Sequence, residues 1–276
     1  MLKKLLKYDF NAIFKYWWIG ALTTLVLSGV GAGCGSILEA EMALPGSVIV
    51  FATIGMVLVV LSIFAFIIFS ELLVYVRFYK HLFTDEGYLT FTLPVKRYQI
   101  LSSKLISGFV CGLATVIVTV IDAAIIILTT FRKEIFYDGW YKDFVEGVKE
   151  LVADFGGVNL VIQIIEIVIF AILGLALSIL FTYLCITFAG AISKKSKLGS
   201  AILIYYGATS VSSVFMYMFY FFGVDAVYGW MYDLSRNTEL ILYPMFLLLA
   251  ILFTAMLCVG AYTLNYRLLD RKLNLN

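Results

Sequence analysis

The sequence predicts an all-α, polytopic membrane protein, and three observations lead to this fold class. First, 63% of the 276 residues are hydrophobic and 14% are charged, whereas soluble domains are about half apolar and a quarter charged. Second, six apolar runs each approach or exceed the roughly 20 residues that a transmembrane helix needs. Third, lysines and arginines concentrate in alternate loops, which orients the spans. Lipid offers no partner to an unpaired backbone group, so each run is expected to be a helix.

Residues 1–17 have the pattern of an amphipathic helix. Apolar residues recur every three or four positions, from Leu2 to Trp17, and lysines occupy the other side. Such a helix lies in the membrane interface rather than crossing it. We therefore expect an N-terminal elbow helix on the cytoplasmic surface.

The predicted spans follow in one membrane domain, without an internal repeat or a low-complexity linker. They are residues 18–38, 48–70, 105–130, 159–189, 200–222 and 240–264. The fourth run is long enough either to tilt or to bend near Gly174.

The distribution of positive charge orients the spans. With both termini inside, fifteen of the twenty lysines and arginines fall on the inner side. An excess of this size satisfies the positive-inside rule. The expected location is therefore the cell membrane, with cytoplasmic N- and C-termini and the lipid bilayer as solvent.

Two outer loops carry patterns of their own. Residues 131–158 place Trp140, Phe144 and Val148 on one face among charged residues, which predicts an amphipathic helix lying on the extracellular surface. Residues 223–239 mix aromatic and acidic side chains. They form either an aromatic belt at the interface or a segment that dips into the membrane.

The first span carries four glycines at alternate positions: Gly29, Gly31, Gly33 and Gly35. They make two overlapping GxxxG pairs, which let helix backbones approach closely. Helix packing explains them better than phosphate binding, because a phosphate loop needs a helix start in water and a lysine. No GxxxxGK[ST] motif occurs in the chain.

Several chemical classes are disfavoured. The four cysteines lie far apart without ligand spacing, so neither a disulfide nor a zinc site is expected. His81 is the single histidine and is expected at the interface. Serines and threonines in the spans lack a base, which argues against an intramembrane protease. We expect no catalytic set, no metal, no nucleic-acid partner and no cofactor bound by this chain.

The stretch between the second and third spans, residues 71–104, is expected in the cytoplasm. Thr84 followed by Asp85 and Glu86 is typical of a helix start. Pro94 limits that helix and suits the first turn of the next one. A helix of two turns is unstable alone, so it needs a surface to dock against. The alternation over 89–93 is also compatible with a strand.

This stretch resembles a known family. Asp85-Glu86-Gly87, Leu89, Leu93-Pro94-Val95 and Lys104 are similar to the pattern between the second and third spans of ABC transporter permeases of the type-2 exporter class. The six spans, inside termini and N-terminal elbow helix match that family as well.

The resemblance implies a transport subunit and its partners. A short helix would seat on a separate ABC ATPase subunit, which binds ATP and Mg²⁺, and a second permease chain would complete the exporter. The substrate would be amphipathic: a peptide, a drug or a lipid. The residues expected to couple to the ATPase are Asp85, Glu86, Gly87, Tyr88, Leu89, Phe91, Leu93 and Pro94.

Two carboxylates fall inside predicted spans, Asp122 in the third and Glu166 in the fourth. A charge in the membrane is expensive, so each should face protein or water. They either line a path for a cation or proton, or are protonated and hydrogen-bonded to a neighbour such as Gln163 or Thr119. The first alternative favours a secondary transporter or channel. A scaffold or sensor that transports nothing is a third possibility.

Overall fold

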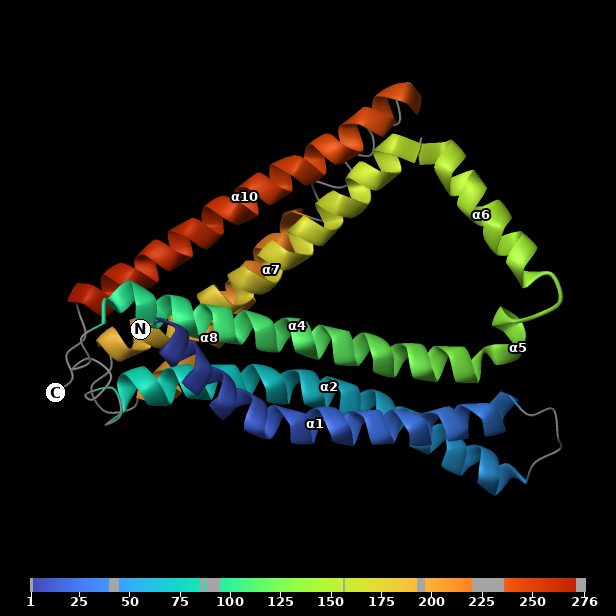
Figure 1. Ribbon diagram of the computed structural model, residues 1–276, viewed down its shortest axis with the longest axis horizontal. Coiled ribbons are helices and arrows are strands. Elements are labelled where there is room, and N and C mark those ends of the chain that lie inside the picture. The colour runs from blue at the N-terminus through green and yellow to red at the C-terminus, as the bar shows by residue number, and fades with distance from the viewer. Residues whose placement is uncertain are drawn as a thin grey trace. The chain divides into compact units, whose positions relative to one another are not determined.

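The computed structural model describes residues 2–39, 45–84, 87, 95–155, 157–192, 197–219 and 236–271. Within these ranges every regular element is a helix (Figure 1). In chain order they are α1 (Leu2–Glu39), α2 (Gly46–Phe83), α4 (Arg97–Thr130), α5 (Arg132–Ile135), α6 (Trp140–Phe155), α7 (Gly157–Ile192), α8 (Lys197–Phe219) and α10 (Arg236–Arg271).

Five of these helices are long and apolar enough to cross a membrane: α1, α2, α4, α7 over Asn159–Ile192, and α10 over Pro244–Asp270. The chain thus has the helices of a multi-pass membrane protein. The predicted span 200–222 forms α8 over its described part, but α8 is not one of the five.

The predicted elbow is not a separate helix. Residues 1–17 and the first predicted span run together as α1, which is unbroken over Leu2–Glu39. The physical reason is local: no proline or glycine stands between Lys15 and Ile19, so nothing interrupts the backbone hydrogen bonds there. The interfacial position of its first turns stays a prediction.

The other helices follow the predicted runs with longer ends. α7 is continuous through Gly174, and α10 continues through Pro244. A proline inside a membrane helix is tolerated because neighbouring groups can satisfy the freed carbonyl. The amphipathic pattern of 131–158 forms α6, whose Phe144 and Leu151 are more than half exposed. Its place on the extracellular surface stays a prediction.

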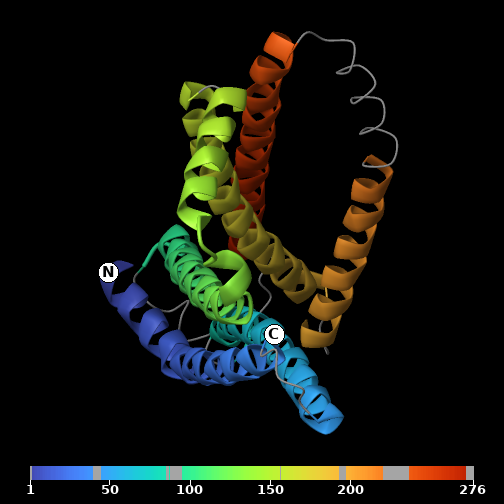
Figure 2. The same cartoon turned by 90° about the vertical axis from the view of Figure 1, so that its right-hand side faces the viewer.

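The chain divides into two compact units. The first comprises Met1–Phe78 and Ser102–Glu146, and within it α1, α2 and α4 lie side by side (Figures 1 and 2). α1 buries a single stripe at three- and four-residue spacing, from Asp9 through Trp17 to Gly35, as expected for one face of a helix. The Trp17 indole N–H donates to the Thr115 hydroxyl over 2.9 Å, so this stripe lies against α4.

The second unit comprises Tyr79–Leu101 and Gly147–Asn276. In it α10 runs alongside α7, and α8 contacts α7 at one end and diverges from α10 (Figure 2). Asn265 of α10 is fully buried and joins the two helices: its amide donates to the Leu180 carbonyl oxygen, and its side-chain oxygen accepts from Thr187. The end of α2 also belongs here, because the Phe83 ring packs directly over Gly190 of α7.

Helix ends around the predicted coupling stretch differ in part from the sequence prediction. α4 begins at Arg97 rather than at Pro94, and Val95 and Lys96 precede it without helical structure. The Thr84 hydroxyl donates to the Lys80 carbonyl oxygen, and the Thr84 carbonyl oxygen accepts from the Gly87 N–H. The predicted helix start at Thr84 stays a prediction, because Asp85 and Glu86 lie outside the described residues.

Candidate functional site

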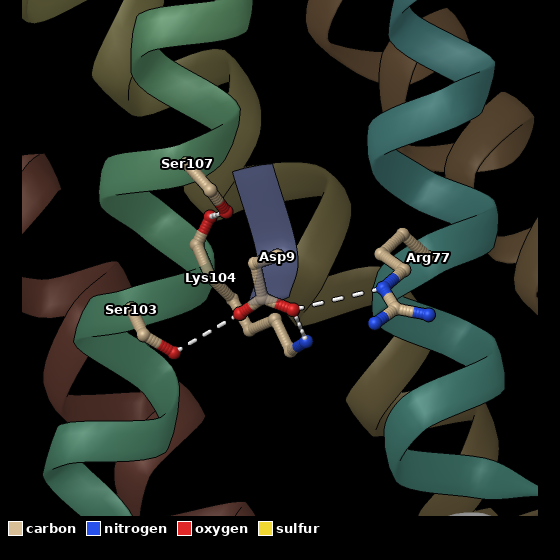
Figure 3. A network of polar contacts seen from close by, with 5 residues as sticks. All are labelled: Asp9, Arg77, Ser103, Lys104 and Ser107. Atoms are coloured by element: carbon tan, nitrogen blue, oxygen red, sulfur yellow. Dashed lines mark hydrogen bonds and ion pairs between the residues drawn. The ribbon is translucent and has the colours of Figure 1, made fainter. Parts of the chain in front are cut away.

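The most strongly polar buried group that the described residues form is an ion-pair cluster in the first unit (Figure 3). Asp9 of α1 lies at its centre. Lys104 of α4 forms an ion pair with Asp9 Oδ1, and Arg77 Nε of α2 lies 3.6 Å from the same oxygen. Ser103 Oγ donates to Asp9 Oδ2 over 3.3 Å. Three helices therefore meet on one carboxylate.

Helical spacing explains how the chain brings these groups together. Asp9 stands four residues before Ile13 and eight before Trp17, so it continues the buried stripe of α1. Lys104 falls on the same face of α4 as Ser107, whose hydroxyl donates to the Lys104 carbonyl oxygen over 3.0 Å. The faces of α1 and α2 that pack in the unit thus carry one member of the cluster each, and that of α4 carries two, Ser103 and Lys104.

The positive and negative charges of the cluster are not balanced, and its side chains differ in burial. One carboxylate faces two cations, so the cluster carries a net positive charge when all three are ionised. The Asp9 and Lys104 side chains are almost completely buried, while Arg77 keeps a quarter of its surface exposed. Burying an ion costs several kcal/mol unless it is paired. Lys104 therefore depends on Asp9, whereas Arg77 can retain contact with solvent.

The cluster flanks the eight predicted coupling residues, which lie between Asp85 and Pro94. Arg77 of α2 precedes Thr84 by seven residues, and Lys104 of α4 follows Arg97 by seven residues. Each separation is about 10 Å of helix. Asp9 consequently ties α1 to the helix that enters the stretch and to the helix that leaves it.

A second polar tie lies in the second unit, at Arg97. Its Nη1 donates to the carbonyl oxygens of Leu269 and Asp270, over 2.7 Å each, and lies 3.1 Å from the Asp270 carboxylate. These carbonyls are at the C-terminal end of α10, where a helix has unsatisfied acceptors and a partial negative charge. The first residue of α4 therefore holds the last turn of α10.

Of the eight predicted coupling residues, the structure describes Gly87. Its N–H donates to the Thr84 carbonyl oxygen over 2.8 Å, and a Cβ at this position would lie 2.7 Å from the Leu82 carbonyl oxygen. Close approach of two backbone segments explains the glycine. The other seven lie outside the described residues: Asp85, Glu86, Tyr88, Leu89, Phe91, Leu93 and Pro94.

Asp122 belongs to the first unit and Glu166 to the second. Asp122 is fully buried, and neither carboxylate oxygen has a hydrogen-bond partner among the described residues. Thr119, one predicted partner, donates to the Val116 carbonyl oxygen instead. Glu166 Oε2 and Gln163 Nε2 are likewise buried without a partner in the described part of the chain. The predicted side-chain hydrogen bonds of these carboxylates are not found there.

The four glycines of α1 divide into two pairs. A Cβ at Gly31 would lie 3.0 Å from Val59 of α2, and one at Gly35 would collide with Thr130 of α4. A Cβ added at Gly29 or Gly33 would meet no atom of the described chain within 4 Å, apart from the backbone of its own helix. Close packing within the unit thus involves Gly31 and Gly35.

Sequence reasoning missed the centre of the cluster. Asp9 lies among the lysines of residues 1–17, and neither Asp9 nor Arg77 belongs to a motif that the sequence analysis identifies. One signal was present: Asp9 is an acidic residue in register with Ile13 and Trp17 on the apolar stripe of the helix. A charge in such a position needs a buried counterion. The sequence singled out Lys104 only as part of the pattern that resembles type-2 exporter permeases.

Comparison of the chain with protein-family models, with curated proteins and with solved structures finds no match.

Proposed function

We propose that this chain is the membrane-spanning subunit of an ATP-driven ABC exporter, working with a separate ATPase subunit and a second permease chain. The observation that carries the proposal is the order of features along the chain. A pattern resembling the coupling motif of type-2 exporters stands between two long apolar helices, α2 and α4, and polar ties hold both of its flanks.

The two ties supply a physical route for force. A short helix docked on an ATPase would be displaced when the ATPase closes around ATP. Arg77 and Lys104 would carry that displacement to α1 through Asp9, and Arg97 would carry it to the end of α10. Buried ion pairs suit this task, because separating the partners would leave a buried charge without compensation, at a cost of about 3–5 kcal/mol.

The first experiment tests the partner. The chain should co-purify with the ATPase encoded by a neighbouring reading frame that carries GxxxxGK[ST], and Phe91→Ala or Glu86→Ala should weaken the complex. Burial of Phe91 at the contact would contribute about 1.5–3 kcal/mol, or at least roughly tenfold in affinity. Phe144→Ala on α6, whose ring is more than half exposed, is the matched control.

Failure of that experiment has a clear form. If no ATPase associates with the full chain in membranes, or if Phe91→Ala and Phe144→Ala bind and transport equally well, the ABC proposal is wrong.

A second candidate function, a proton- or cation-coupled transporter, is favoured by Asp122. A fully buried carboxylate without a partner among the described residues is the kind of group on which membrane transporters bind a proton or cation. The two candidates separate in vesicles without ATP. Flux that persists there and is lost on Asp122→Asn would support the second candidate and contradict the first.

A further inference from the structure

A groove in the second unit has no role in the coupling route. It measures about 1120 Å³ and lies between α7, α8 and α10. Small-molecule sites in proteins typically occupy about 300–1,000 Å³, so the groove exceeds the usual size. Its walls include two glycines, Gly174 of α7 and Gly260 of α10, and a Cβ added at either would meet no atom of the described chain within 4 Å.

The lining of the groove excludes an ionised ligand. No charged side chain of the described residues contributes to it, and most of its surface is apolar. A charge placed there would lose its hydration without gaining a counterion. The occupant is therefore uncharged over the part that enters the groove.

Hydroxyl groups in the walls of the groove can form hydrogen bonds with a ligand. Ser178 donates to the Leu175 carbonyl oxygen, Thr209 to that of Tyr205, and Ser213 to that of Ser210, over 2.8–2.9 Å. Because each hydroxyl proton is already engaged with its own helix, what remains toward the groove is the oxygen lone pairs. Tyr205, Ser212 and Tyr217 also line the groove and bring further hydroxyl groups, which can donate as well as accept. A ligand hydroxyl, which both donates and accepts, suits this set.

The length of the groove matches one leaflet of a bilayer. On α8 its wall extends from Tyr205 to Tyr217, and on α7 from Gly174 to Leu184. These stretches correspond to about 18 Å and 15 Å of helix, against about 15 Å for half of the hydrocarbon layer.

We propose that the groove between α7, α8 and α10 binds an uncharged lipid that has a hydrocarbon chain and a free hydroxyl donor. Diacylglycerol represents the class. The apolar wall takes the chain, and the oxygens of Ser178, Thr209 and Ser213 accept from the hydroxyl. Binding requires no ATPase. If the proposed exporter function holds, this lipid is also its cargo.

The test uses the full chain in phosphatidylcholine nanodiscs and a diacylglycerol with a diazirine on one acyl chain. The matched probe is the same lipid with its hydroxyl methylated. After photolysis, cross-linked peptides are mapped by mass spectrometry. Label should concentrate on α7, α8 and α10, and the methylated probe should label about fivefold to tenfold less, as expected for one lost hydrogen bond.

Two sets of variants sharpen the result. Gly174→Leu and Gly260→Leu fill the groove and should abolish its labelling. Gly207→Leu should leave the labelling unchanged, because Gly207 has open space around it within the described chain but does not line the groove. Should the leucine variants fail to fold, the combined substitutions Ser178→Ala, Thr209→Val and Ser213→Ala remove the three hydroxyls with little change of shape. They should reduce the preference for the free hydroxyl to near one.

Three outcomes would overturn the inference: label spread evenly over the lipid-exposed helices, equal labelling by the two probes, or undiminished labelling in folded Gly174→Leu and Gly260→Leu proteins. Cross-links from the groove to a second copy of the chain, in place of lipid, would also overturn it. Loss of ATPase association leaves these readouts unaffected, so the lipid site and the exporter proposal can fail separately.

Discussion

Lys104 forms a buried ion pair with Asp9, ninety-five residues earlier in the chain, and each side chain exposes less than a twentieth of its surface. The pair holds the start of α4 against the first turns of α1. Its members depend on each other, because either ion alone would be buried without compensation.

Asp9→Asn should destabilise the protein by about 3–5 kcal/mol, because it leaves the Lys104 ammonium buried without a counterion. The double substitution Asp9→Leu with Lys104→Met should recover most of this loss, since apolar residues of similar size can replace a buried pair. Thermal unfolding in detergent measures both. Lys7→Met, at an exposed position of the same helix, is the control and should have little effect. Equal stability of Asp9→Asn and Lys7→Met would contradict the assignment of the cluster.

Gly35→Ala should destabilise the protein by about 1–3 kcal/mol, because the added methyl group collides with Thr130 and over-packs the contact between α1 and α4. Gly33→Ala, two residues earlier and with no described atom within 4 Å, should instead stabilise it by up to about 1 kcal/mol through helix propensity. Opposite signs in one unfolding assay are the expected result. A destabilising Gly33→Ala would indicate that this face packs against something outside the described chain.

Thr115→Val should cost about 1–3 kcal/mol, because it leaves the buried Trp17 indole N–H without its acceptor. Thr115 also donates to the Cys111 carbonyl oxygen, so its hydroxyl both donates and accepts. Unfolding followed by tryptophan fluorescence reports the change close to the site. Thr119→Val is the matched control, since Thr119 bonds only within its own helix turn in the described contacts; a loss as large there would argue against the indole bond as the cause.

Asn265→Leu should loosen α10 from α7. The substitution removes the hydrogen bond to the Leu180 carbonyl oxygen and the contact with Thr187, which are 3.0 and 2.9 Å long. Polar contacts between membrane helices contribute about 0.6 kcal/mol on average and up to about 1.7 kcal/mol. A double-mutant cycle with Thr187→Val should give a coupling energy in this range. Strict additivity of the two substitutions would show that Thr187 and Asn265 do not interact.

Much of the fold could be predicted because the lipid environment restricts the secondary structure that an apolar segment can adopt. Long apolar runs must be helices, and the predicted runs around Val59, Cys111 and Leu180 lie within α2, α4 and α7. Helix ends were less predictable. Pro94 suits a first helical turn by propensity, yet α4 begins at Arg97, where the guanidinium binds the end of α10. Such a tertiary contact outweighs a local preference and has no local signal.

The candidate site was harder to predict than the fold, because it depends on which residues of distant segments come together. The α1 register aligns Asp9 with Trp17, and this could be derived from spacing alone. That Lys104 and Arg77 provide the counterions could not, because fifteen cationic residues were available on the same predicted side of the membrane. The groove was missed for the same reason: its three walls come from helices whose apolar surfaces look alike in sequence.

The unbroken length of α2 has a mechanical consequence. Its 38 residues correspond to about 57 Å of helix, against about 30 Å of hydrocarbon in a bilayer. Roughly half of the helix therefore extends beyond the hydrocarbon layer as a stiff rod. If such a rod tilts about the membrane surface, its two arms are about equally long. A displacement of the outer end would then reach the other side of the bilayer at about its full amplitude and in the opposite direction.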